Sequence, residues 1–209
     1  MYNFQYANPT RICFGEGQIA RLPELIPAGS RLLVLYGGGS IKQNGVYEQL
    51  TQALAGREWL EFPGIGANPQ YDQLMEAVAL VKRERIDFLL AVGGGSVVDG
   101  TKFVAAAACF EEGDPWEILR DKAPIKGALP LGCVLTLPAT GSESNPAAVV
   151  SRGEAKLSFY NPLVQPVFAV LDPATTYSLP PRQVGNGVVD AFVHILEQLS
   201  LIHISEPTR

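Results

Sequence analysis

Hydrophobic residues gather in short runs that are separated by glycine-rich turns and by longer segments of helical periodicity. Runs of strand length occur at residues 31–36, 59–62, 87–92, 131–138 and 167–173. Apolar residues at helical spacing predict helices within residues 41–56, 70–84 and 97–109. The strand runs are almost wholly apolar, as strands buried on both faces must be. The alternation of strand and helix therefore predicts an α/β fold, with a parallel sheet covered by helices on both faces.

Two of the predicted strands end in the same four residues, GGGS, at 37–40 and 93–96. Ligands of such folds bind beyond the carboxyl ends of the strands. Glycine lets backbone amides approach a ligand closely, and the amino end of the following helix attracts negative charge. Gly94, Gly95 and Ser96 are therefore candidates to bind a pyrophosphate, although the G-x-G-x-x-G fingerprint is absent.

A purely structural interpretation of this turn is also open. Ser96 could cap the following helix, and Asp99 three residues on would complete a capping box. For one GGGS turn alone we favour that interpretation. Two such turns after two buried strands shift the balance towards nucleotide binding.

The first turn bears on the choice of cofactor. NAD sites commonly use an acidic residue to bind the ribose 2′-hydroxyl, but the segment GGGSIK contains no carboxylate. Ser40 and Lys42 could instead bind a 2′-phosphate by hydrogen bond and charge. The alternative is that Lys42 is an ordinary surface lysine near a turn.

A third turn, TLPATGSES at 136–144, offers several hydroxyl groups at another strand end. The hydroxyls of Thr136, Thr140, Ser142 and Ser144 could hydrogen-bond a nicotinamide carboxamide or ribose. Thr140 with Glu143 also fits a capping box, and this alternative stays open. The serine-hydrolase signature G-x-S-x-G is absent, so we do not expect nucleophilic serine chemistry.

Asp190 and His194 lie four residues apart in a segment of helical periodicity. This spacing puts a carboxylate and an imidazole on one helix face, where both could bind a metal ion. Two ligands rarely make a metal site, so a solvated ion pair is the alternative.

Composition narrows the classes further. Hydrophobic residues make up 47% of the 209 residues and the net charge is −5, which favours a globular protein that does not bind nucleic acid. No uninterrupted apolar run is long enough for a membrane span, and the first residues lack a signal core, so we expect a cytoplasmic protein. The three cysteines are expected to be buried thiols without a disulfide or metal role.

Several segments together resemble the iron-containing (group III, metal-dependent) alcohol dehydrogenases, in the branch of NADPH-dependent aldehyde reductases and butanol dehydrogenases. The matching segments are PTRICFGEG (9–17), GGGSIK (37–42), AVGGGSVVDGTKF (91–103), LTLPATGSESN (135–145), PVFAVLDP (166–173) and LPPRQVGNGVVDAFVHILEQ (179–198). The combination of AVGGGSVVDGTKF with DAFVH is specific, whereas either one alone is weak. The resemblance covers residues 1 to about 198, which is about half of the usual length of the family.

The resemblance implies a metal-dependent oxidoreductase that interconverts small aldehydes and primary alcohols with NADP(H). It implies a nucleotide-binding α/β domain and an all-helical domain, with the active site in the cleft between them and a divalent ion, iron or zinc, held by one Asp and three His. Asp190 and His194 match the Asp and the first His. By position, Gly38, Gly39 and Ser40 match the turn beside the adenosine ribose, Thr136 and Thr140 match residues beside the nicotinamide, and Lys156 matches a lysine near the nicotinamide ribose.

The same resemblance sets the expected domain boundaries. Residues 1–177 are expected to form the dinucleotide-binding domain, and residues 178–198 the start of a truncated helical metal-binding domain. Residues 199–209, LSLIHISEPTR, do not look like the family and resemble the translation of a sequencing adapter, so we interpret them as an artefactual tail. A homodimer formed partly through Arg11–Phe14 is implied for the full-length protein.

Three hypotheses follow from these residues. The parent protein is an NADPH-dependent alcohol dehydrogenase or aldehyde reductase, and this fragment is inactive because metal ligands are missing. Alternatively, the chain is a non-catalytic nucleotide-binding module. The third possibility is a relative with the same fold and different chemistry, such as a glycerol dehydrogenase or a dehydroquinate-synthase-like lyase. No catalytic residue and no particular substrate can be assigned from the sequence.

Overall fold

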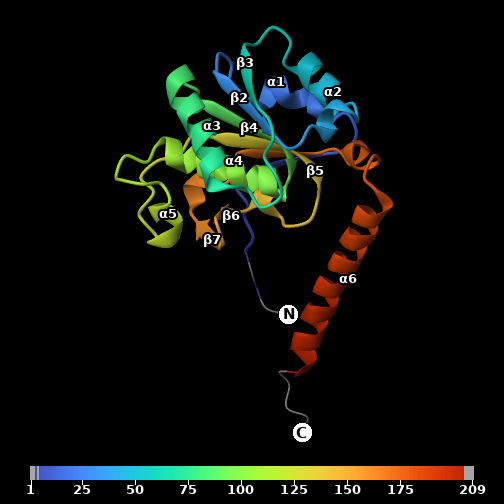
Figure 1. Cartoon of the computed structure of the whole chain (residues 1–209). Coiled ribbons are helices and arrows are strands. Elements are labelled where there is room, and N and C mark those ends of the chain that lie inside the picture. Colours follow the sequence, from blue (N-terminus) through green and yellow to red (C-terminus); the bar gives the residue numbers. More distant parts are fainter. Residues whose placement is uncertain (1–2, 4, 205–209) are drawn as a thin grey trace. The chain divides into compact units, whose positions relative to one another are not determined.

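The structure is a computed structural model that describes residue 3 and residues 5–204, with side chains as far as residue 199. The chain forms two compact units, Met1–Thr176 and Tyr177–Arg209. The first unit contains both sheets, and the second consists mainly of the long helix α6, Pro181–Ile204 (Figure 1). The expected domain boundaries, including an artefactual tail, remain predictions. The backbone is helical as far as Ile204, and residues 205–209 lie outside the described residues.

Six parallel strands form the central sheet of the first unit. Their order across the sheet is β1 (Arg11–Phe14), β8 (Phe168–Leu171), β5 (Leu131–Leu137), β4 (Phe88–Gly94), β2 (Leu32–Tyr36) and β3 (Trp59–Phe62). Every neighbouring pair is parallel. The predicted α/β class with a parallel sheet is therefore confirmed.

Helices cover both faces of this sheet, as the apolar strands require (Figure 1). One face packs against α1 (Leu22–Leu25) and α2 (Val46–Ala53), and the other against α3 (Tyr71–Glu84) and α4 (Gly95–Ala108). Further short elements are α5 (Glu117–Arg120) and the 3-10 helices η1 (Gln18–Arg21), η2 (Ser40–Lys42), η3 (Ser142–Ser144), η4 (Pro162–Val164) and η5 (Pro173–Thr176).

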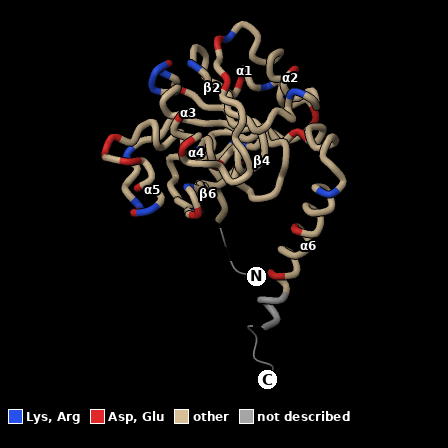
Figure 2. The backbone as a smooth tube through the Cα atoms, viewed as in Figure 1, with Lys and Arg blue, Asp and Glu red and all other residues tan. Residues whose placement is uncertain are grey.

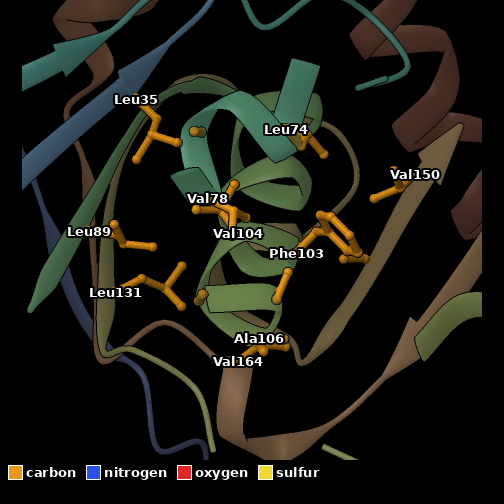
Figure 3. Close-up of a cluster of buried hydrophobic side chains, with 14 of the residues drawn as sticks. Leu35, Leu74, Val78, Leu89, Phe103, Val104, Ala106, Leu131, Val150 and Val164 are labelled. Carbon is orange, nitrogen blue, oxygen red and sulfur yellow. The ribbon is translucent and has the colours of Figure 1, made fainter. Parts of the chain in front are cut away.

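Successive residues of a strand point to opposite faces, so each central strand contributes to two cores. In β2, Leu33 and Leu35 belong to the core under α3 and α4, whereas Leu32 and Val34 belong to the core under α1 and α2. Figure 3 shows Val104 of α4 at the centre of the first core, among side chains of α3 and of the sheet. Helix α4 is thus fixed by its apolar residues, and this fixes the position of its amino end.

A two-stranded hairpin was missed by the sequence pattern. Strands β6 (Ala147–Arg152) and β7 (Ala155–Tyr160) pair antiparallel beside α4.

The predicted helix over 41–56 is also shorter than expected, because Gly45 adopts a left-handed φ of 80° and α2 begins after it.

Charged residues lie outside the central strands (Figure 2). Strands β2 and β4 contain none. Among the described residues, no helix is long and apolar enough to span a membrane.

All three cysteines are free thiols, and Cys13 and Cys133 are buried as expected. The expectation for Cys109 is wrong: α4 ends at Ala108, and Cys109 lies exposed at the turn that follows.

Candidate functional site

The two GGGS turns lie side by side at the carboxyl edge of the sheet. Strands β2 and β4 are direct neighbours, and Tyr36 is paired with Val92, the last residue before each glycine run. The chain leaves β2 towards β3 on one side, whereas β4 continues to β5 on the other side. The strand order thus reverses between β2 and β4, and a crevice for a ligand opens at such a reversal in α/β folds.

The second turn delivers the amino end of α4 to this crevice. Strand β4 runs through Gly94, and α4 begins at Gly95 without any side-chain hydrogen bond to its first amides. The alternative of a capping box by Ser96 and Asp99 does not form, because the carboxylate of Asp99 accepts hydrogen bonds from Ser142 and Val149 instead. A helix of fourteen residues without a capping side chain presents its amides and its positive dipole end to an anion.

The first turn is open and its backbone is bare. A Cβ atom added to Gly38 or Gly39 would have no other atom within 4 Å, and Gly39 has a left-handed φ of 100°. Ser40 and Lys42, both exposed, follow in the short helix η2. Backbone amides and two polar side chains thus border the crevice on the β2 side.

A carboxylate lies next to this turn, although the segment GGGSIK itself contains none. Glu61 in β3 has an oxygen 3.3 Å from Lys42 Nζ. The residue was missed because it lies nineteen positions further along the chain. It reaches Lys42 because β3 is the parallel neighbour of β2.

Both oxygens of Glu61 already accept hydrogen bonds from the protein. Tyr36 and Lys42 donate to Oε2, and Tyr47 donates to Oε1 at 2.6 Å. Burial alone would raise the pKa of Glu61, but these hydrogen bonds outweigh it and lower the pKa below its ordinary value. Hydrogen bonding to Tyr36 and Glu61 raises the pKa of Lys42, whose ammonium group also lies 4.6 Å from the centre of the Tyr47 ring. Lys42 is thus a fully charged cation held at the edge of the site.

The third turn packs against the start of α4. Thr136 lies half-buried near the end of β5, and Thr140 lies exposed in the turn. A Cβ atom at Gly95 would lie only 2.5 Å from Thr140 Oγ1, so the threonine fills the space that glycine leaves. The alternative of a capping box with Glu143 is not formed, because Gly141 is the residue at the start of η3, although Thr140 Oγ1 accepts a hydrogen bond of 3.4 Å from the Ser142 amide.

Lys156 lies in strand β7 of the hairpin, far from the glycine turns in the sequence. Its ammonium group donates a hydrogen bond of 2.7 Å to Asn68 Oδ1. Asn68 belongs to the loop that follows β3, and Ile65 of that loop donates to the carbonyl of Tyr36 at 3.1 Å. One short loop therefore connects Lys156 to the base of the first glycine turn.

Asp190 and His194 share one face of α6, as their spacing predicts. Asp190 Oδ1 lies 3.7 Å from His194 Nε2, and both side chains are more than half exposed. Glu197 Oε2 is 3.8 Å from the other ring nitrogen. Among the side chains that the structure describes, which end at residue 199, no group of three or more His, Cys, Asp or Glu is arranged to hold a metal ion.

The arrangement of the first unit defines a class of protein. A parallel sheet whose strand order reverses between two glycine turns, one of which opens a helix, is typical of nucleotide-binding α/β proteins. The chain belongs to the iron-containing alcohol dehydrogenase family, whose sequence pattern it matches over residues 9–173.

Individual relatives agree with this assignment. The chain is 60% identical over 202 residues to the NADPH-dependent aldehyde reductase YqhD of Escherichia coli K12, covering 95% of this chain and 52% of that protein. It is 47% identical over 203 residues to a probable NADH-dependent butanol dehydrogenase of Bacillus subtilis, with coverage of 95% and 52%.

The same holds for solved structures. The crystal structure of E. coli YqhD superposes with a TM-score of 0.88 over 94% of this chain and 51% of that one, at 60% identity. An NADH-dependent butanol dehydrogenase from Thermotoga maritima gives a TM-score of 0.85 at 44% identity, again with 94% and 51% coverage. The chain thus spans about half the length of the relatives that it matches.

Proposed function

We propose that this chain is the nucleotide-binding half of a metal-dependent oxidoreductase that interconverts small aldehydes and primary alcohols with NADP(H). The observation that carries the proposal is the meeting of the two glycine turns at the strand-order reversal, with the uncapped amino end of α4 between them and Lys42 at the rim. The named activities of the relatives, an aldehyde reductase and butanol dehydrogenases, supply the reaction class.

Gly94, Gly95 and Ser96 would bind the pyrophosphate through the first amides of α4. Gly38 and Gly39 would let the adenosine ribose approach the backbone, since nothing lies within 4 Å above them. Thr136, Thr140 and Lys156 would hydrogen-bond the nicotinamide half. The shape and the donors of these residues fit an anionic dinucleotide.

Lys42 and Ser40 would select NADP(H) over NAD(H). The 2′-phosphate is a dianion and favours a fixed cation. Glu61 is the carboxylate that could bind an unmodified ribose, but its two oxygens already accept three protein hydrogen bonds. One relative is named as an NADPH-dependent enzyme and another as an NADH-dependent enzyme. The preference between the two cofactors therefore has to come from particular residues, and Ser40 and Lys42 are those that we propose.

Asp190 and His194 would supply two ligands of a divalent ion. The carboxylate oxygen of Asp190 and the imidazole nitrogen of His194 suit iron(II) or zinc(II). When bound, such an ion polarises the carbonyl group of an aldehyde while the reduced nicotinamide supplies hydride. Two ligands leave the ion weakly held, so we expect the 209-residue chain by itself to be inactive. In the full-length protein, the edge strand β1 would contribute to a homodimer.

A non-catalytic nucleotide-binding module is the second candidate. The observation in its favour is that the described side chains include no group of three or more potential ligands arranged to hold a metal ion. A glycerol dehydrogenase or dehydroquinate-synthase-like activity has no specific observation in its favour here.

The proposal is tested by titrating the purified chain with NADPH and following the fluorescence of the nicotinamide. We expect saturable binding, with weaker binding of NADH. Butyraldehyde reduction is then assayed with iron(II) or zinc(II), where we expect no turnover by the chain and metal-dependent turnover once the gene segment downstream of codon 198 is joined to it. Absence of NADPH binding, or turnover by the short chain, contradicts the proposal.

A further inference from the structure

Lys102 is a buried cation on α4, two turns after the glycine turn, and the proposed function does not use it. Its side chain is fully buried. A buried ammonium group is costly unless every donor has a partner, and a lysine on an ordinary helix face would be replaced by an apolar residue without loss. Burial lowers the pKa of Lys102 to about 8. A lysine buried in this way is a candidate for a positioning role that uses its charge.

The donors of Lys102 are completely used. Its Nζ atom lies 2.9 Å from Ser142 Oγ, 3.2 Å from Asn145 Oδ1 and 2.7 Å from the carbonyl oxygen of Ala147. A protonated lysine has three N–H donors, so the three acceptors match them one to one. All three acceptors follow β5 and belong to the segment that contains Thr140.

Asp99, one turn before Lys102 on α4, holds the same segment from the other side. One of its oxygens accepts a hydrogen bond from Ser142 Oγ, and the other accepts one from Val149 N at 3.0 Å. The hydroxyl of Ser142 thus accepts from the lysine and donates to the aspartate. This chain of charge-assisted hydrogen bonds connects α4 to the middle of the β5–β6 loop, residues 138–146, and to the start of β6.

The loop in turn touches the first residue of α4. Thr140 Oγ1 occupies the position next to Gly95 where a Cβ would lie 2.5 Å away. Asn145 reinforces the loop internally, because its amide donates to the carbonyl of Gly141 at 2.9 Å. The loop is therefore fixed at its middle by Lys102 and at its tip by contact with α4.

We propose that Lys102 is a positioning residue of the nucleotide site: by holding Ser142, Asn145 and Ala147 it fixes the β5–β6 loop, and with it Thr140, against the amino end of α4. Asp99 and Ser142 complete this Lys102 cluster. The inference rests on the proposed function, because it assigns Thr140 and the start of α4 to one bound dinucleotide. No residue of the cluster touches the cofactor in this proposal.

A pH profile gives a readout that a merely structural role would not move. A neutral amine has only two N–H donors, so one of the three acceptors is lost when Lys102 deprotonates. The charged or titratable groups that face it are Asp99 on α4, Cys133 on β5 and Glu143 in η3. We expect NADPH affinity of the chain to fall as the pH rises from 7 to 9.5, and this fall to be absent in Lys102→Met.

The central experiment compares the 209-residue chain with Lys102→Met and with the matched control Lys82→Met, an exposed lysine on α3. Amide hydrogen exchange and NADPH titration are measured on each. In Lys102→Met we expect exchange in the β5–β6 loop to be faster by about tenfold or more, unchanged protection in β5, and a dissociation constant for NADPH raised by about tenfold, corresponding to the loss of a few hydrogen bonds to a charged group. Lys82→Met should change neither.

Equal exchange and equal affinity in Lys102→Met overturn the inference, and so does a faster loop without any loss of affinity. If Lys102→Met does not fold, Ser142→Ala decides, because it keeps both charges and removes only the bridging hydroxyl: faster loop exchange supports the inference and unchanged exchange overturns it. If the unaltered chain fails to bind NADPH, the proposed function fails. The exchange comparison then still decides whether Lys102 holds the loop.

Discussion

Lys42 Nζ lies 3.3 Å from Glu61 Oε2, although one residue follows β2 and the other belongs to β3. The lysine is held by a carboxylate that also accepts hydrogen bonds from Tyr36 and Tyr47. The sequence around the glycine turn contains Lys42 but not Glu61, so the pair could not be predicted from that segment alone. The pair places a fixed positive charge where the proposed 2′-phosphate would bind.

Replacing Lys42 by methionine should therefore weaken NADPH binding selectively. We expect the dissociation constant for NADPH to rise by about tenfold and that for NADH to change by less than about twofold, because only NADPH carries the 2′-phosphate. The control is Lys126→Met, which removes a similarly exposed lysine from a pair with Glu112 elsewhere on the surface. An equal change for both cofactors would show that Lys42 does not contact the phosphate.

The contact between Gly95 and Thr140 predicts a mutation with a matched rescue. In Gly95→Ala the new methyl group would lie 2.5 Å from Thr140 Oγ1, so the free energy of unfolding should fall by about 1–3 kcal/mol. Thr140→Ala removes this oxygen and leaves Thr140 Cβ, at 3.5 Å, as the nearest atom. Urea unfolding of the two single variants and the double variant measures the coupling, and strictly additive losses would contradict the contact.

Asp114 should contribute stability that disappears in acid. Burial alone would raise its pKa, but hydrogen bonds from Tyr71, the Trp116 amide and Arg152 outweigh burial and lower the pKa to about 2. A carboxylate with a lowered pKa stabilises the fold above its ordinary value of 3.8 and loses this contribution as the pH falls towards 2.

The corresponding variant is Asp114→Asn. Because the side chain is 42% exposed, solvent screening reduces the contribution to about 1 kcal/mol. We expect Asp114→Asn to be less stable than the unaltered chain at pH 7 and nearly equal to it at pH 2, as measured by urea unfolding. Asp121→Asn, in an exposed pair with Arg120, serves as control and should show a smaller difference. A constant difference across this range would contradict the assignment.

Helix α6 should promote association of the isolated chain. Val189, Val193 and Leu196 are 44–61% exposed, and their unit provides no further helix to cover them among the residues that the structure describes. Exposed apolar area of this kind favours aggregation. We expect sedimentation to show self-association that is reduced when the three residues are changed to serine, threonine or glutamine. A monomer that melts cooperatively without these changes would be inconsistent with the expectation.

Much of the sheet could be predicted from the sequence, and the reason is physical. Strands β2, β4 and β5 are buried on both faces, so their apolar runs stand out, and a turn rich in glycine and small polar residues lies at the carboxyl end of each. The hairpin β6–β7 was missed because β7 alternates exposed and buried residues over only six positions and includes lysine. Cys109 was wrongly placed in the core because the alanine-rich run before it hides the end of α4.

Candidate site residues could be predicted where the signal lies within a short stretch of sequence, and could not be predicted where it depends on contacts between distant residues. Gly38 and Gly95 could be found because a run of glycines directly after a buried strand is a strong local signal of a ligand-binding turn. Glu61 and Lys102 could not be assigned, because their partners lie nineteen and forty residues away. For Lys102, the available signal was a lysine followed by FVAAAA, a charge embedded in an otherwise apolar helix. The capping box of Ser96 and Asp99 does not form because Asp99 accepts hydrogen bonds from Ser142 and Val149.

The two cores described above are built from residues up to Leu171, so the first unit closes both faces of its sheet with its own side chains. The boundary after Thr176 is consequently a natural place to divide the gene. We expect the residues before this boundary to fold without α6, which can be checked by expressing them alone and following their urea unfolding. Such a self-contained piece would be a starting point for a split-protein reporter.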